Sequence, residues 1–372
     1  MDAYFTESLM SITVEQVKAA LAQIIDPNTG KDYVSGKAVK NLKVEGGTIS
    51  LDIELGYPAV SQFDAIRSSV SSALEALPGA GTASVGVSSK IISHTVQRGL
   101  KLMPNVKNII AVASGKGGVG KSTTAVNLAL ALAAEGAAVG LLDADIYGPS
   151  QPTMLGVAGR RPETLDGKTM EPLENYDVQV SSIGFLIDPD EPMVWRGPMV
   201  TQALQQLLEQ TNWKDLDYLI VDMPPGTGDI QLTLSQKVPV TGAVIVTTPQ
   251  DIALLDARKG LKMFEKVGIP ILGIVENMST HICSNCGHAE EIFGAGGGAK
   301  MCADFNVDFL GALPLTMAIR EQADSGKPTV VADPDGPVAV IYKEIARKVA
   351  VQVAEKAKDL SSKFPSIVIK ND

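Results

Sequence analysis

The sequence predicts an α/β protein with a mostly parallel sheet flanked by helices, preceded by a small α+β domain. With 372 residues, the chain is long enough for two domains. It is 45% hydrophobic but only 5% aromatic, so aliphatic side chains must form most of the core, as they do in buried parallel sheets. From residue 106 onward, short apolar segments rich in β-branched residues alternate with segments of helical spacing. That alternation is typical of a parallel sheet covered by helices on both faces.

The first 88 residues are expected to form the small domain. Thr13-Val14-Glu15-Gln16 has the pattern of a capping box. The helix that it opens is expected to run to about Ile25, before the Asp26-Pro27 turn. This part contains no cysteine and no glycine-rich phosphate loop, so we interpret it as an accessory interaction module. The other expected elements are a hairpin, a second helix and a third strand, at residues 39–44, 49–55, 63–77 and 82–87.

Residues 89–105 are expected to link the small domain to a larger one, residues 106–372. His94 lies alone in this linker. A lone histidine without nearby cysteine or carboxylate spacing is interpreted as a packing or surface residue rather than a metal ligand.

The strongest functional signal is a glycine-rich loop between a predicted strand and a predicted helix. Residues 115–122 fit the pattern G-x-x-x-x-G-K-[ST], and the strand before them and the alanine-rich helix after them supply the context that a phosphate loop requires. Glycines let backbone N–H groups turn toward a phosphate, and the helix N-terminus adds positive charge. The predicted nucleotide-binding residues are Gly115, Lys116, Gly117, Gly118, Val119, Gly120, Lys121, Ser122 and Thr123.

Four further positions complete the predicted chemistry of a P-loop NTPase. Lys121 is expected to reach the β- and γ-phosphates of ATP, and the Ser122 hydroxyl to ligate Mg²⁺. Asp222 ends a buried strand, where a Mg²⁺-associated aspartate is required. Asp145 is the candidate for orienting the attacking water, since no glutamate follows Asp222. Gly226 can present its N–H to the γ-phosphate in a loop that would act as a switch.

Asp143 and Asp145 both follow a buried strand, so their roles overlap. One of the two carboxylates could instead cap the next helix, and Asp143 is the candidate for that structural role.

Lys116 directly follows the first glycine of the loop. The stretch G-K-G-G-V-G-K-[ST] resembles the deviant phosphate loops of MinD/ParA-like ATPases. The resemblance implies that Lys116 reaches the nucleotide of a partner subunit, where it would stabilise transition-state charge as an arginine finger does. The alternative is a solvated loop lysine.

The chain has three cysteines, two of them in a C-x-x-C motif at Cys283 and Cys286. A thioredoxin-type redox pair is one interpretation. A zinc site is a second, with His281, His288 or Cys302 among the added ligands. A [4Fe–4S] cluster needs four thiolates, which two chains related by a two-fold axis would supply. This third interpretation agrees with the dimer that Lys116 implies, and Cys302 is then a buried thiol.

Charge and patterning argue against several partners. The formal net charge is −10 and no run of lysines or arginines is present, so neither nucleic acid nor an acidic membrane surface is expected as a partner. The segment Met1–Glu7 is polar and acidic, unlike a secretory signal. No apolar stretch approaches the roughly 18 residues of a membrane helix. We therefore expect a soluble, cytoplasmic protein.

These motifs together resemble the Mrp/ApbC family of iron–sulfur carrier ATPases, with an N-terminal MIP18-like (DUF59) domain. The resemblance implies slow ATP hydrolysis coupled to binding a [4Fe–4S] cluster in a homodimer. The cluster would be received from assembly scaffold proteins and transferred to apo-proteins. It also implies that Cys283 and Cys286 bind the cluster and that Asn277 contacts adenine. The segments that carry it are 115–123, 143–149, 222–229, 277–286, 292–298, 309–315 and 319–321.

Two other functions share the phosphate loop. A positioning ATPase of the MinD/ParA kind would bind a membrane or DNA in a nucleotide-gated manner and would not need Cys283 and Cys286. A regulatory ATPase would use the cysteines to bind zinc.

Overall fold

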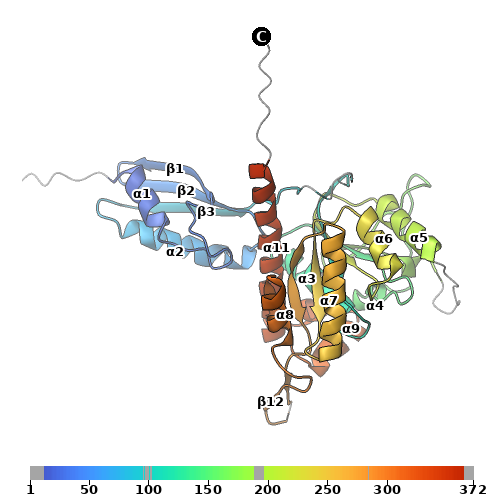
Figure 1. Ribbon diagram of the computed structural model, residues 1–372. Coiled ribbons are helices and arrows are strands. Elements are labelled where there is room, and N and C mark those ends of the chain that lie inside the picture. Colours follow the sequence, from blue (N-terminus) through green and yellow to red (C-terminus); the bar gives the residue numbers. More distant parts are fainter. Residues whose placement is uncertain are drawn as a thin grey trace, which may run out of the picture. The chain divides into compact units, whose positions relative to one another are not determined.

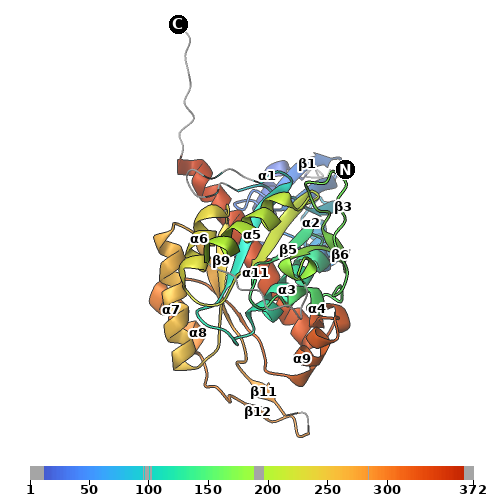
Figure 2. The same ribbon diagram turned by 90° about the vertical axis from the view of Figure 1, so that its right-hand side faces the viewer.

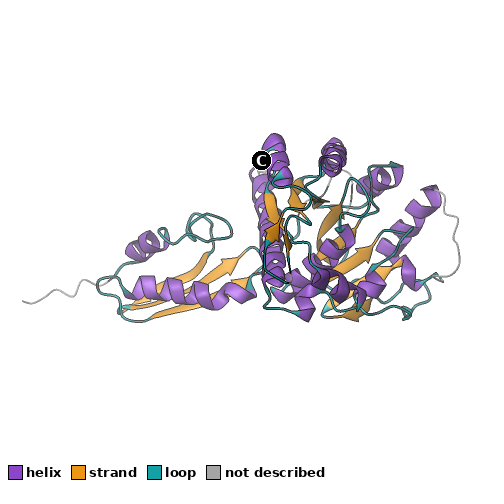
Figure 3. Cartoon of the chain, turned by 90° about the horizontal axis from the view of Figure 1, so that it is seen from below, coloured by secondary structure: helices purple, strands orange, loops and turns teal. Residues whose placement is uncertain are grey.

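The computed structural model describes residues 12–94, 96, 100, 103–187, 197–283 and 285–363. The chain divides into two compact units, Met1–Ile91 and Ile92–Asp372. Each unit has its own sheet with helices packed against it (Figures 1 and 3). Among the residues that the structure describes, no helix combines the length and apolar character needed to span a membrane.

The smaller unit is an α+β fold, as predicted. Its described residues form a sheet of order β1-β2-β3, in which β1 is antiparallel and β3 parallel to the central strand. The inward side chains of β2 alternate with outward ones, which gives the sheet one buried face. The elements are α1 (Val14–Leu21), β1 (Val39–Glu45), β2 (Thr48–Leu55), α2 (Phe63–Glu75) and β3 (Ala83–Ser89).

The first helix is shorter than its sequence pattern predicts. The Thr13–Gln16 capping box forms as predicted, but α1 ends at Leu21 rather than near Ile25. Ile25 is 54% exposed and pairs with Asp32 in an isolated β-bridge. The helix therefore ends four residues before the position that the apolar spacing indicates, and backbone pairing across the Asp26–Gly30 turn takes the place of the last helical turn.

The larger unit is built on a sheet of eight described strands in the order β13-β10-β9-β4-β8-β5-β7-β6. All neighbours are parallel except β6, which pairs antiparallel with β7 at one edge. This confirms the mostly parallel sheet. Its strands are β4 (Val106–Ala113), β5 (Val139–Asp143), β6 (Leu173–Asn175), β7 (Val178–Ser182), β8 (Leu216–Asp222), β9 (Gly242–Thr247), β10 (Ile271–Glu276) and β13 (Phe309–Ala312).

Helices cover both faces of this sheet (Figure 3). Helices α5 to α8 contact one another in a row, and α3 contacts α4, α10 and α11 in a second group. The described core beneath α5 to α8 is mostly aliphatic, and both these helices and the strands of the sheet contribute to it. The helices are α3 (Lys121–Ala134), α4 (Gln151–Met154), α5 (Gly197–Gln210), α6 (Asp229–Lys237), α7 (Asp251–Lys266), α8 (Gly297–Phe305), α9 (Met317–Asp324), α10 (Thr329–Ala332) and α11 (Pro337–Lys363).

The C-terminal helix α11 docks along α3 (Figure 1). Arg347 of α11 forms a buried ion pair with Glu135 at the end of α3. Tyr342 is fully buried and hydrogen-bonds Thr124 of α3. These polar contacts fix α11 against the helix that follows the phosphate loop.

His94 is a packing residue, as interpreted from the sequence. It is 3% exposed, and its Nδ1 lies 2.5 Å from Asn108 Oδ1 on β4. Asn108 in turn donates to the Ile92 carbonyl at 3.0 Å. This arrangement anchors the start of the larger unit to its central strand.

We expect His94 to make the protein less stable in mild acid. Burial holds the pKa of His94 below its usual 6.5, so the unfolded chain takes up a proton that the folded chain resists. The stability that neutral His94 contributes above pH 6.5 is therefore lost as the pH falls toward the lower pKa of His94 in the folded chain. Between pH 7 and pH 5, thermal unfolding should show a decrease in melting temperature that is a few degrees larger than in His94→Gln. Equal decreases would contradict this account.

Candidate functional site

The phosphate loop lies between β4 and α3, which confirms the predicted strand–loop–helix context. Two of its glycines are required by geometry. A Cβ on Gly115 would lie 2.1 Å from the backbone of Asp256 in α7, so only glycine lets the loop pass this close. Gly120 has φ +82°, and a Cβ there would lie 2.1 Å from Asn277 Nδ2. The loop is therefore held between α7 and the residues after β10.

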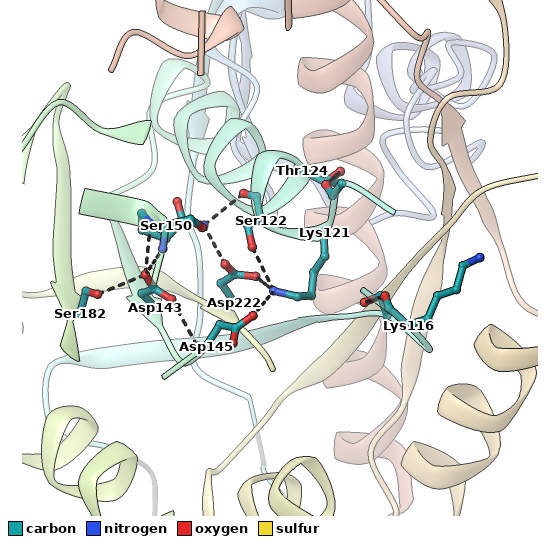
Figure 4. A network of polar contacts seen from close by, with 12 residues as sticks. Lys116, Lys121, Ser122, Thr124, Asp143, Asp145, Ser150, Ser182 and Asp222 are labelled. Atoms are coloured by element: carbon teal, nitrogen blue, oxygen red, sulfur yellow. Dashed lines mark hydrogen bonds and ion pairs between the residues drawn. The ribbon is translucent and has the colours of Figure 1, made fainter. Parts of the chain in front are cut away.

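Lys121, the first residue of α3, lies at the centre of a buried polar cluster (Figure 4). Its side chain is 6% exposed and its ammonium forms an ion pair with Asp222 at the end of β8. The same nitrogen is 3.1 Å from Ser122 Oγ and 4.0 Å from Asp145 Oδ2. The structure thus brings together four of the predicted site residues. Hydroxyl and carboxylate oxygens that converge on one cation are the donor set that Mg²⁺ prefers, so these residues fit the predicted metal.

Asp143 supports the segment that follows β5. It accepts backbone N–H groups from Asp145 at 3.2 Å, Ser150 at 3.0 Å and Gln151 at 3.1 Å. The Ser182 hydroxyl lies 3.1 Å from the same carboxylate (Figure 4). Burial, and next the nearby Asp222 carboxylate, raise the pKa of Asp143 to about 7. The contacts confirm the interpretation of Asp143 as a capping carboxylate.

Asp145 lies two residues further along the same segment, beside Lys121. Burial raises the pKa of Asp145, and the Lys121 ammonium opposes that rise. A carboxylate in this position can accept a hydrogen bond from a water near the phosphate site.

Gly226 follows β8 in the segment expected to act as a switch. Its φ is +96°, and its N–H donates to the Ser114 carbonyl at 3.0 Å. The sequence predicts that this N–H faces the γ-phosphate, whereas here it binds the chain segment leading into the phosphate loop. A change of hydrogen-bond partner would therefore be needed for it to reach a nucleotide.

Lys116 does not join the Lys121 cluster. Its side chain points away from Lys121 and the aspartates (Figure 4), and its ammonium forms no ion pair with any residue that the structure describes. The carbonyl of Lys116 accepts the Ser114 hydroxyl at 2.9 Å, which fixes the backbone of the loop while leaving the ammonium group unrestrained.

Cys283 and Cys286 lie on a short hairpin formed by β11 (His281–Ile282) and β12 (Ala289–Glu290). Figures 1 and 2 show this hairpin extending from the body of the larger unit. Backbone N–H groups of Cys286 and Asn285, and then the Cys286 thiol, hydrogen-bond the Cys283 sulfur and lower the pKa of that thiol. Both cysteines are free thiols. The hairpin thus favours the thiolate form, which binds metals.

The hairpin and the phosphate loop leave the same edge of the sheet, because β4 and β10 are parallel strands of one sheet. Asn277, directly after β10, donates from Nδ2 to the Val119 carbonyl in the phosphate loop at 2.9 Å. Glu276 accepts the N–H of Gly298 at the start of α8. Residues 277–297 therefore form an excursion whose first residue contacts the phosphate loop and whose base is closed by Glu276.

The additional ligands considered for zinc are not gathered around the cysteine pair. Cys302 is 5% exposed within the core, as predicted for a buried thiol, and burial raises its pKa to about 11. His281 Nδ1 lies 3.0 Å from the Leu315 carbonyl. Across the described residues, no group of three or more histidine, cysteine, aspartate or glutamate side chains is arranged to hold a metal ion.

Gln151 is the residue of this site that the sequence analysis does not identify. It opens α4, is completely buried and binds Asp222 through its side chain. No pattern around a single glutamine in the segment after β5 marks it, so only the tertiary structure shows its position.

Comparison with known proteins decides the family. The family model described as "NUBPL iron-transfer P-loop NTPase" matches residues 105–350. The chain belongs to this family. A second model, described as "Iron-sulfur cluster assembly protein", matches residues 14–87. The expected membership in an iron–sulfur carrier family with an N-terminal assembly-type domain is confirmed, and so is the enzyme class at the level of P-loop NTPases.

Two known relatives match most of the chain. The "Iron-sulfur cluster carrier protein" of Escherichia coli (strain K12) is 50% identical over 337 residues, 91% of each chain. The protein of the same name from Pseudomonas fragi is 64% identical over 275 residues, 74% of this chain and 96% of the relative. A solved nucleotide-binding protein from Archaeoglobus fulgidus, in complex with ADP, is 35% identical with a TM-score of 0.55 and matches 62% of this chain and 90% of its own.

Proposed function

We propose that this protein is an ATPase that carries a [4Fe–4S] cluster between two identical subunits and transfers it to apo-proteins. The observation that carries the proposal is the hairpin with Cys283 and Cys286, whose backbone N–H groups favour a thiolate, at the same sheet edge as the phosphate loop. The names of the relatives from Escherichia coli and Pseudomonas fragi support the same cargo.

The number of thiolates supports a symmetric dimer. A [4Fe–4S] cluster takes four cysteine thiolates, and the hairpin of one chain offers two. A two-fold axis passing between two hairpins would supply all four. The exposed Ile282 and Ile292 on and beside the hairpin provide apolar surface for such a contact.

The nucleotide site is proposed to bind ATP with Mg²⁺. Residues 115–123 would surround the phosphates, Lys121 would bind the β- and γ-phosphates, and Asn277 would lie near adenine. Ser122 and Asp222 would hold Mg²⁺, which neutralises charge that develops on the transferring phosphate. Asp145 would orient the attacking water.

The segment after β8 that contains Gly226 would respond to the presence of the γ-phosphate. When its N–H turns to the phosphate, the bond to the Ser114 carbonyl must break, so the segment after β8 would move with nucleotide state. Asn277 hydrogen-bonds the phosphate loop and is also the first residue of the excursion that carries Cys283 and Cys286. We therefore propose that nucleotide binding changes the affinity of these cysteines for the cluster through Asn277.

The N-terminal unit is proposed to dock assembly scaffold proteins or apo-protein recipients. We propose domain boundaries of 1–88 and 106–372, joined by residues 89–105, in a cytoplasmic protein that binds neither nucleic acid nor membrane.

A positioning ATPase would give no role to the thiolate-favouring hairpin, so the cysteine pair favours the carrier function.

Anaerobic reconstitution tests the proposed function. Full-length protein is incubated with ferrous iron and sulfide, desalted, and assayed for iron, sulfide, visible absorption and molecular mass. We expect about four iron and four sulfide per dimer, followed by activation of an apo-enzyme that requires a [4Fe–4S] cluster. A strictly monomeric protein without iron, whatever the nucleotide, would reject the proposal.

A further inference from the structure

Gln151 lies between two elements of the nucleotide site. It is the first residue of α4 and has no exposed surface. Its side-chain nitrogen donates to Asp222 Oδ2 at 2.8 Å and to the Ser122 carbonyl at 3.1 Å. The other oxygen of Asp222 forms the ion pair with Lys121. One carboxylate oxygen is thus bound by an amide, and the other faces a cation.

The chemistry of these partners decides which way the amide points. Both atoms that face Nε2, the Asp222 oxygen and the Ser122 carbonyl, are acceptors. An NH₂ group has two donors and satisfies both, whereas an amide oxygen in the same place would be repelled by both. The N–H of the same residue donates to Asp143 at 3.1 Å. Gln151 therefore joins the ends of β8 and β5 and the start of α3.

We propose that Gln151 is a positioning residue of the nucleotide site, which orients Asp222 toward the cation and ties that carboxylate to the segment carrying Asp145. The inference deepens the proposed function, since it rests on the proposed Mg²⁺ site. Because the Gln151 amide holds Oδ2, the Asp222 carboxylate cannot rotate freely, and Oδ1 stays directed at the Lys121 ammonium. Partners of this kind tune a metal site without touching the metal.

The competing explanation is that Gln151 only fills space. The two explanations differ in what a residue of similar length without donors would do. Gln151→Met keeps most of the volume but removes both hydrogen bonds to Asp222 and Ser122. Gln151→Glu keeps the shape but places an oxygen against two acceptors. Gln179→Met is the matched control, because Gln179 on β7 of the same sheet also makes two side-chain hydrogen bonds, at 3.1 and 3.0 Å with the backbone of Lys214.

The experiment measures the affinity of the full-length protein for a fluorescent ATP analogue across a Mg²⁺ titration and in EDTA. For Gln151→Met we expect the Mg²⁺ concentration at half-maximal tightening to rise about 10- to 100-fold, with affinity in EDTA unchanged. Gln151→Glu should show at least as large a shift. Gln179→Met should match wild type in both titrations, with at most a lower melting temperature.

Two results would overturn the inference in distinguishable ways. If Gln151→Met weakens binding equally with Mg²⁺ and in EDTA, or leaves the Mg²⁺ titration at the wild-type position, the side chain only packs. If wild type itself shows no Mg²⁺ dependence, the proposed metal site fails and this inference with it. Because Gln151→Met carries no new charge, it keeps the test decisive even if Gln151→Glu does not fold.

Discussion

The variant Cys283→Ala/Cys286→Ala is expected to lose the iron–sulfur cluster completely while still binding ATP. Each chain would then contribute no thiolate, and the two subunits could not supply the four that a [4Fe–4S] cluster requires. The nucleotide residues Lys121 and Asp222 lie on other elements, so nucleotide affinity should stay within about twofold of wild type. Anaerobic reconstitution followed by iron and sulfide analysis measures the loss, and a fluorescent ATP analogue measures the nucleotide affinity.

Cys302→Ala is the matched control for this experiment. Cys302 is buried in α8, and burial raises the pKa of its thiol to about 11, so it is a poor ligand at neutral pH. The variant should retain the full complement of iron and lose about 1 kcal/mol of unfolding free energy, since a small buried group is removed. A cluster that survives in the double variant, or disappears in Cys302→Ala, would contradict the assignment of the cysteine pair.

The elements that sequence predicts well are those in which local pattern and tertiary role coincide. The phosphate loop has a defined length, requires glycines and must follow a strand and precede a helix, so the stretch from β4 to α3 can be identified from residues alone. Asp222 at the end of β8 is equally predictable, because a buried parallel strand places its last residue at the ligand-binding edge of the sheet. Such signals depend on neighbours in the chain.

The features that sequence does not reveal depend on partners far along the chain. Gln151 meets Asp222 across 71 positions, and Asn277 meets Val119 across 158. In the smaller unit the Asp26 carboxylate accepts the Tyr57 hydroxyl at 2.8 Å, which makes Asp26 a buried structural carboxylate as well as part of a turn. Periodicity also fails where backbone pairing competes with it, as at Ile25, and where strands are as short as β6.

Two glycines hold the base of the excursion that carries the cysteines. Gly297 and Gly298 are the first two residues of α8. A Cβ on Gly297 would lie 2.5 Å from Leu254, and one on Gly298 would lie 3.0 Å from Glu276. These glycines therefore permit α8 to pack closely against α7 and β10, so the base of the excursion is held firmly and the hairpin at its tip is the part left free to meet a partner.

Lys116→Ala is expected to lower ATP turnover by about 10³-fold or more, because the ammonium would act as an arginine finger does. We propose that this charge serves the site of the other subunit, because the Lys116 side chain points away from Lys121 in its own chain. Nucleotide affinity should change far less, since Lys121 remains in place to bind the phosphates. Steady-state turnover and binding of an ATP analogue separate the two effects.

Mixing two inactive variants distinguishes action across the dimer from action within one chain. Asp145→Asn keeps Lys116 but lacks the carboxylate proposed to orient water, whereas Lys116→Ala keeps Asp145. In a mixed dimer, the Lys116→Ala subunit has an intact site and receives the lysine of its partner. Random pairing at equal amounts makes half of the dimers mixed, each with one complete site, so turnover should recover to about a quarter of wild type.

The control for mixing is the Lys116→Ala/Asp145→Asn double variant, which offers no lysine to its partner and should rescue nothing. Differently tagged chains and mass measurement establish that mixed dimers form in both cases. If mixed dimers form and turnover stays at the level of the single variants, Lys116 acts within its own chain. The dimer would then be needed only to bind the cluster. Any coupling between ATP turnover and dimer formation would in that case depend on the contacts of Asn277 and Gly226.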